Sequence, residues 1–151
     1  MEEITPIDND ELRDSYQSRG FGTCGPAVVA VMFNRTVQDI IDNWSQLYRG
    51  FCSFKELQLE LEKYGWKSER VESWNKRVFM IPDGAEQAVC LIKWKEKYSK
   101  WPIAEKNTHF IILRKTDNGV RVFCNSVGWV DIDHKKIKEH LKKGKAKAYL
   151  I

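Results

Sequence analysis

The first apolar segment of the chain reads GTCGPAVVAV, residues 22–31. The lone cysteine is preceded by Gly-Thr and followed by Gly-Pro, and small apolar residues then run without interruption. Proline is tolerated in the first turn of a helix, where its missing N–H has no intrahelical partner anyway. The pattern therefore predicts a loop that ends at Cys24 and a buried helix that begins there. Cys24 would lie at the positive end of the helix dipole, which favours a thiolate over a thiol.

The composition is typical of one globular domain. The chain has 151 residues, 42% hydrophobic and 30% charged, so we expect a single domain over residues 1–151, in which residues 1–15 could form an irregular segment. No run approaches the ~18 consecutive apolar residues of a membrane-spanning helix. The N-terminus is acidic and lacks the apolar core of a signal peptide. We expect a cytoplasmic protein without membrane contacts, in the host cytoplasm if the chain is viral.

The four cysteines are too far apart for a zinc ribbon or a redox motif. Cys24, Cys52, Cys90 and Cys124 include no C-x-x-C pair, so no metal and no cofactor are expected. Reduced thiols are the default for a chain without a signal peptide. We expect the last three cysteines in the core, because they lie in or beside apolar runs.

Much of the net charge of +4 comes from the lysine-rich segment HKKIKEHLKKGKAK, residues 134–147. Such a run is most often a solvated helix face, and we expect its two imidazoles, His134 and His140, to face solvent. Nucleic-acid binding is the alternative function of this segment, and it predicts binding that weakens steeply with salt. The acidic N-terminus and the small net charge argue against it.

The predicted elements run from helices to strands. Helices are expected at residues 24–33, from the cap at residues 36–39 to about Trp44, and from a capping box at residues 53–56 to a stop at Gly65. Strand-like runs follow at residues 66–74, 88–92, 109–115 and 120–130, then a short helix at 131–144 and a closing strand at 146–151. The expected fold is α+β, with N-terminal helices packed on a C-terminal antiparallel β-sheet.

A cysteine nucleophile needs a base, a group that orients the base, and donors for the oxyanion. His109 is the candidate base, because it begins an apolar strand after a polar segment. If residues 117–119 form a three-residue loop, Asn125 lies one diagonal step from His109 and can orient its ring, whereas a two-residue loop puts the two side chains on opposite faces. Gln17 is the candidate oxyanion donor, together with the backbone N–H of Cys24.

Five segments together resemble the papain-like fold and, more narrowly, the peptidases that trim double-glycine leaders from bacteriocin precursors. They are YQSRGFGTCGPAVVA, FCSFKELQLELEKYGW, AVCLIKW, THFIILRKTDNGVRVFCNSVGWV and KAYLI. The resemblance implies Cys24 as nucleophile, His109 as general base, Asn125 in the position of the family's Asp, and Gln17 at the oxyanion hole. The chain departs from the family where Gln17 lies one residue farther from Cys24, where Asn125 replaces Asp and where Ser126 replaces Pro.

The sequence thus predicts a cysteine peptidase that hydrolyses a peptide or related amide bond of a protein or peptide substrate. Trp129 is expected over the site, where it would shield the hydrogen bond between His109 and Asn125. The alternative is a catalytically inactive protein with the peptidase fold that binds a partner, for example a viral or mobile-element factor that holds a host protein.

Overall fold

The computed structural model describes residues 24–45, 47, 52–95 and 108–151. The chain divides into two compact units, Met1–Lys67 and Ser68–Ile151. Gln17 and the segment 1–15 lie outside the described residues. The prediction of a single domain over residues 1–151 stays a prediction.

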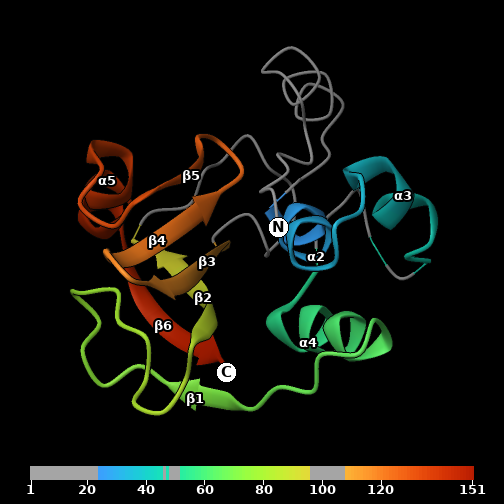
Figure 1. Ribbon diagram of the computed structural model, residues 1–151, viewed down its shortest axis with the longest axis horizontal. Coiled ribbons are helices and arrows are strands. Elements are labelled where there is room, and N and C mark those ends of the chain that lie inside the picture. The colour runs from blue at the N-terminus through green and yellow to red at the C-terminus, as the bar shows by residue number, and fades with distance from the viewer. Residues whose placement is uncertain (1–23, 46, 48–51, 96–107) are drawn as a thin grey trace. The chain divides into compact units, whose positions relative to one another are not determined.

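In its described part, the first unit contains three helices (Figure 1): α2 (Cys24–Phe33), α3 (Val37–Asp42) and α4 (Phe54–Lys63). Helix α2 is strongly apolar, and its residues 25–30 are buried, as expected of a core helix. Asn34 ends the helix in the left-handed conformation, with φ of 56°. The N–H of Arg35 then donates to the carbonyl oxygen of Ala30 at 2.9 Å, which satisfies one of the last carbonyl groups of the helix. The prediction of a helix over residues 24–33 is confirmed.

The next two helices both begin at a predicted capping residue. Oγ1 of Thr36 accepts the N–H of Asp39 at 3.1 Å, while the Asp39 carboxylate pairs with Arg35 at 2.9 Å. The cap of α4 is reciprocal: Oγ of Ser53 accepts the N–H of Glu56 at 3.1 Å, and Oε1 of Glu56 accepts the N–H of Ser53 at 2.8 Å. Each of these bonds satisfies an N–H that the first helical turn leaves without a backbone partner.

The helix ends follow the same local rules. Helix α3 ends at Asp42, short of the expected Trp44, and the N–H of Asn43 bonds to the carbonyl oxygen of Asp39 at 3.2 Å. Helix α4 ends before Gly65, whose φ of 107° is readily adopted by glycine alone. The predicted stop at Gly65 is confirmed.

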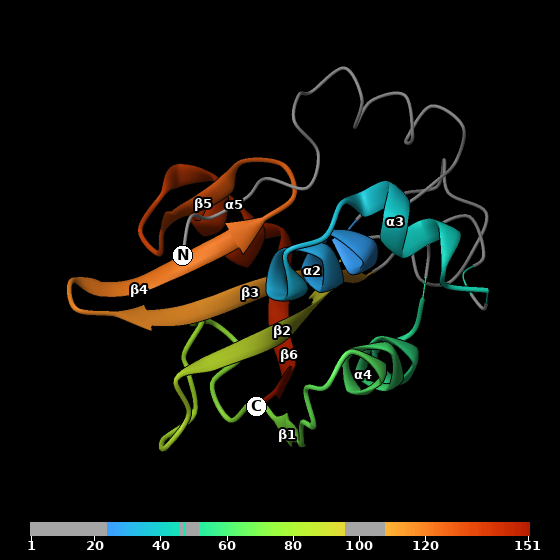
Figure 2. The same ribbon diagram turned by 45° about the vertical axis from the view of Figure 1, so that its right-hand side comes forward.

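The second unit is built on a six-stranded sheet with the strand order β1-β6-β2-β3-β4-β5. Every strand pair is antiparallel. The elements are β1 (Arg70–Glu72), β2 (Gln87–Trp94), β3 (Thr108–Thr116), β4 (Gly119–Cys124), β5 (Gly128–Asp131), α5 (Lys135–Lys143) and β6 (Gly144–Leu150). Figure 2 shows β3 and β4 as a long hairpin and β6 alongside β2. The α+β class, with helices first and an antiparallel sheet after them, is confirmed.

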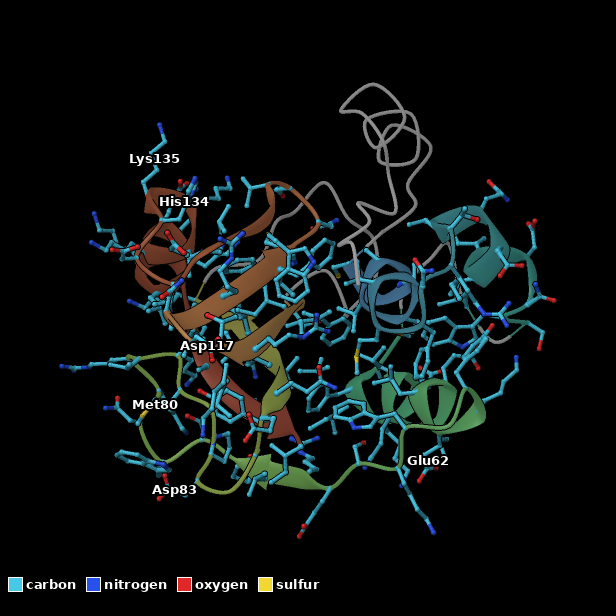
Figure 3. The ribbon with its side chains drawn as sticks, viewed as in Figure 1. Glu62, Met80, Asp83, Asp117, His134 and Lys135 are labelled. Carbon is cyan, nitrogen blue, oxygen red and sulfur yellow. The ribbon has the colours of Figure 1, made fainter. Side chains whose placement is uncertain are left out.

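One face of this sheet carries the main core of the second unit. Alternate residues of a strand share a face. On this face, side chains of helix α5 and of the loop between β1 and β2 pack against the strand residues. Figure 3 labels Met80 and Asp83 in that loop. The buried residues of this core are Phe79, Ile81, Ala88, Cys90, Ile92, Ile111, Leu113, Val122, Cys124, Ile137, Ala146 and Tyr149.

The β3–β4 hairpin turns on two residues, Asp117 and Asn118. Thr116 pairs with Gly119, and Ile112 pairs with Phe123. The hairpin therefore has a two-residue loop, and not the three-residue loop on which the predicted proximity of His109 and Asn125 depended. Because the side-chain period of a strand is two, this shift by one residue changes which side chains share a sheet face with His109.

Candidate functional site

Cys24 is the first residue of helix α2 and is half-buried. Gly25 and Pro26, which follow it in the first turn, are buried. All four cysteines lie among the described residues, and none of them forms a disulfide. The expected position of Cys24 at the start of an apolar helix is confirmed, and its role as a nucleophile stays a prediction.

His109 lies near the start of β3 and pairs with Ile92 of β2. Its Nε2 atom is 3.3 Å from Sγ of Cys124. The imidazole also stacks on Trp94, with ring centroids 5.7 Å apart and an interplanar angle of 20°. The hairpin register explains this contact, since His109, Ile111 and Cys124 belong to one sheet face.

His140 reaches the same sulfur from helix α5. Its Nε2 atom is 3.3 Å from Sγ of Cys124, and only 6% of the residue is exposed. The prediction that His140 faces solvent is therefore wrong. The spacing contains the missed signal: His140 is three residues after Ile137 and precedes Leu141, so it shares their apolar helix face. The charged residues around it form the opposite, solvated face, where Figure 3 shows Lys135 extending away from the sheet.

Cys124 is buried, as are Cys52 and Cys90, so the prediction that all three lie in the core is confirmed. Its sulfur does more than fill space, because it lies between two imidazoles. The sulfur also receives hydrogen bonds from the backbone N–H and the side chain of Ser126, whereas the N–H of Val127 donates to the carbonyl oxygen of Cys124 at 3.1 Å. Burial nevertheless raises the pKa of Cys124 above its ordinary value, so the side chain is a thiol near neutral pH.

Both imidazoles are neutral near pH 7. Burial lowers the pKa of His109 to about 3, helped by the neighbouring His140 and Lys136. Burial also lowers the pKa of His140 to about 4, and the ammonium group of Lys136 acts in the same direction. Desolvation is the largest cause for both rings, because it disfavours the charged form of a histidine.

The register bears on two expectations about the surroundings of His109. Asn125 is the first residue after β4, and continued alternation would put it on the face of Phe110 rather than that of His109. Its role in orienting His109 stays a prediction. Trp129 pairs with Phe123 on that other face, and the Arg114 guanidinium lies 4.6 Å from its ring centroid. Trp129 therefore does not shield a hydrogen bond between His109 and Asn125.

Cys24 belongs to the first unit and His109 to the second, so their predicted meeting stays a prediction. Gln17, the predicted oxyanion donor, lies outside the described residues. Within the described residues, the one group of three or more metal-ligating side chains that could share an ion is His109, Cys124 and His140, whose ligand atoms all lie within 4.8 Å of one another.

Comparison with known protein families, with curated proteins and with solved structures finds no match to this chain. None of the helices in the described parts of the chain combines the length and the apolar content that crossing a membrane requires.

Proposed function

We propose that the chain is a papain-like cysteine peptidase in which Cys24 is the nucleophile and His109 the general base. The observation that carries the proposal is the position of Cys24, a half-buried thiol at the first residue of the apolar helix α2. A helix N-terminus favours the thiolate, which is the nucleophilic form of cysteine. The absence of a disulfide at Cys24 is consistent with this role.

In this proposal Cys124, in place of Asn125, orients the ring of His109. Sγ of Cys124, rather than Asn125, lies 3.3 Å from Nε2 of His109. Nδ1 of His109 has no hydrogen-bond partner among the described residues, so it is the ring atom that remains for proton transfer. A hydrogen bond at one ring nitrogen fixes the tautomer and the orientation of the other. Cys124 is thus a positioning residue in this proposal.

The chemistry follows the usual course of a thiol hydrolase. His109 takes the proton of the Cys24 thiol, the sulfur attacks the carbonyl carbon of the scissile amide, and His109 gives that proton to the leaving amine as the C–N bond breaks. Water then attacks the resulting thioester while His109 takes a proton from it. The C–S bond breaks, the carboxylic acid leaves, and the proton on His109 returns to the Cys24 sulfur. The Cys24 backbone N–H and Gln17 would bind the oxyanion, and the loss of one such donor typically costs about 10²–10³ in rate.

The test is hydrolysis of a mixed peptide library by the full chain under reducing conditions, followed by mass spectrometry. Cleavage products must appear with the natural chain and with Cys52→Ala, a control that truncates a buried thiol of the same unit. They must be missing with Cys24→Ala. Products that persist at the same rate in Cys24→Ala would rule the nucleophile out.

A second candidate function is supported by the surroundings of His109. The ring packs against Trp94, and burial lowers its pKa to about 3, which disfavours the imidazolium that pairs with a thiolate. A protein with the peptidase fold that binds a partner without cleaving it has no need of that imidazolium. This alternative predicts that Cys24 reacts with iodoacetamide at pH 6 no faster than an ordinary thiol.

A further inference from the structure

The cluster formed by His109, Cys124 and His140 converges from three separate elements, β3, β4 and α5. Both Nε2 atoms lie 3.3 Å from the same sulfur, and the two imidazole rings are 5.0 Å apart between centroids. Trp94 of β2 packs against both rings, at 5.7 Å from His109 and 5.4 Å from His140. The three ligand atoms are buried, so the cluster is held by the core and does not depend on surface side chains.

The fold positions each member for a local reason. His109 and Cys124 share a sheet face because the hairpin turns on two residues. Ile137 is fully buried in the core and packs α5 against that face. This packing places His140 beside Cys124. After Cys124 the chain turns back into β5 at Gly128, with φ of 76°. In this turn the N–H of Val127 closes on the carbonyl oxygen of Cys124 at 3.1 Å, and Ser126 donates to the sulfur.

The distances fit a tetrahedral metal ion. With Zn–S near 2.3 Å and Zn–N near 2.0–2.1 Å, a tetrahedral ion holds each nitrogen about 3.5 Å from the sulfur. The observed separations of 3.3 Å are close to that value. The two nitrogens are at most 4.8 Å apart. The same geometry requires roughly 3.3 Å between them, which the imidazoles can reach by rotating toward each other.

The chemistry of the ligand set also fits. Two neutral imidazoles and one thiolate are ligands that zinc prefers, and the hydrogen bonds from the backbone and the side chain of Ser126 stabilise the sulfur as an anion. The ammonium group of Lys136 lies near the cluster and opposes a cation. It is within 4.0 Å of the Glu139 carboxylate, which offsets its charge.

We propose that His109, Cys124 and His140 bind Zn²⁺, with a water molecule in the fourth position. On binding, the Cys124 thiol releases its proton to solvent, the thiolate forms the Zn–S bond, and each imidazole donates its Nε2 lone pair. The site shares His109 with the proposed peptidase, but it does not rest on that function, because the evidence for it is the convergence of three buried ligand atoms.

The experiment uses Co²⁺ as a spectroscopic probe for Zn²⁺ in the full chain, after treatment with a chelator and under reduction. Co²⁺ must produce a thiolate-to-metal charge-transfer band with a stoichiometry of one ion per chain, and Zn²⁺ must displace it. Cys90→Ala is the matched control, since Cys90 is a buried thiol of the same core. The band must persist in Cys90→Ala and in Cys24→Ala, and it must vanish in Cys124→Ala.

The loss of a ligand is expected to lower Zn²⁺ affinity by more than the roughly 10–100-fold that loss of an outer partner typically costs. No thiolate band in the natural chain at saturating Co²⁺, or an unchanged band in Cys124→Ala, would overturn the site. If Cys124→Ala does not fold, the imidazole NMR signals of the natural chain decide. Zn²⁺ must then shift the signals of His109 and His140 and leave that of His134 in place, and unshifted signals of the first two would overturn the site as well.

Discussion

Nε2 of His140 lies 3.3 Å from Sγ of Cys124, and this contact joins helix α5 to the end of strand β4. The same sulfur contacts His109 at the start of β3. A change that loosens the packing of α5 should therefore also alter the position of the His109 ring, although the two histidines lie on different elements.

Ile137→Ala tests how α5 is held. Ile137 is fully buried, so its truncation leaves a cavity and should lower the free energy of unfolding by about 2–5 kcal/mol. Urea titration of the natural chain and of the variant measures this loss. Lys138→Ala, an exposed neighbour on the same helix, should stay within about 0.5 kcal/mol of the natural chain. Equal effects of the two changes would mean that α5 does not pack as described.

Ser126→Ala tests the hydrogen bonds to the sulfur. The side chain of Ser126 donates to Cys124, and its removal should weaken Co²⁺ and Zn²⁺ binding about 10-fold. Val127→Ala is the control, because the side chain of Val127 is exposed and its backbone N–H, which donates to the carbonyl oxygen of Cys124, is kept. Metal affinity that is the same in Ser126→Ala, Val127→Ala and the natural chain would exclude a role for the hydroxyl group.

The metal-free protein should lose stability in mild acid. The pKa of His109 is lowered to about 3 and that of His140 to about 4, whereas an unfolded histidine titrates near pH 6.5. Between these values the unfolded chain binds more protons than the folded chain, so stability falls as pH drops from about 6.5 toward 4. Lys136 and Lys143 act in the same direction on His140, and Glu139 opposes them.

Urea midpoints measured from pH 7 to pH 4 with a chelator present should show this loss, and His140→Gln should reduce its slope. The subtraction of the two curves removes the contribution of the carboxylates that the variants share. Parallel curves for the natural chain and His140→Gln would contradict the burial of that imidazole.

Zinc should inhibit the proposed peptidase. Coordination at Nε2 of His109 leaves the proton on Nδ1, so the ring can no longer accept one. Hydrolysis that depends on Cys24 should therefore fall when Zn²⁺ is added and return with a chelator. Cys124→Ala should be far less sensitive to Zn²⁺ in whatever activity it retains. Inhibition of equal strength in both chains would place the inhibitory ion elsewhere.

Local sequence rules predicted the elements well. Ser53 and Glu56 form the predicted capping box, Asn34 closes α2, and Gly65 follows α4. Each depends on hydrogen bonds between residues a few positions apart, which the sequence displays directly.

The surroundings of His109 were not predictable in the same way. The predicted pairing of His109 with Asn125 depended on one residue in the length of the hairpin loop. In the observed register, the side chain that contacts His109 is Cys124. His140 was misplaced because the lysines around it dominate the composition of its segment, whereas its spacing from Ile137 decides its burial. Contacts between distant elements depend on packing, which composition does not encode.

The most direct test of the proposed function is the rate at which iodoacetamide modifies Cys24 at pH 6, followed by peptide mass spectrometry. The buried Cys52 and Cys90 serve as internal standards for unreactive thiols. If Cys24 pairs with His109, it should react faster than an ordinary thiol, and His109→Gln should slow it to the ordinary rate. A slow reaction that His109→Gln leaves unchanged would contradict the catalytic pair.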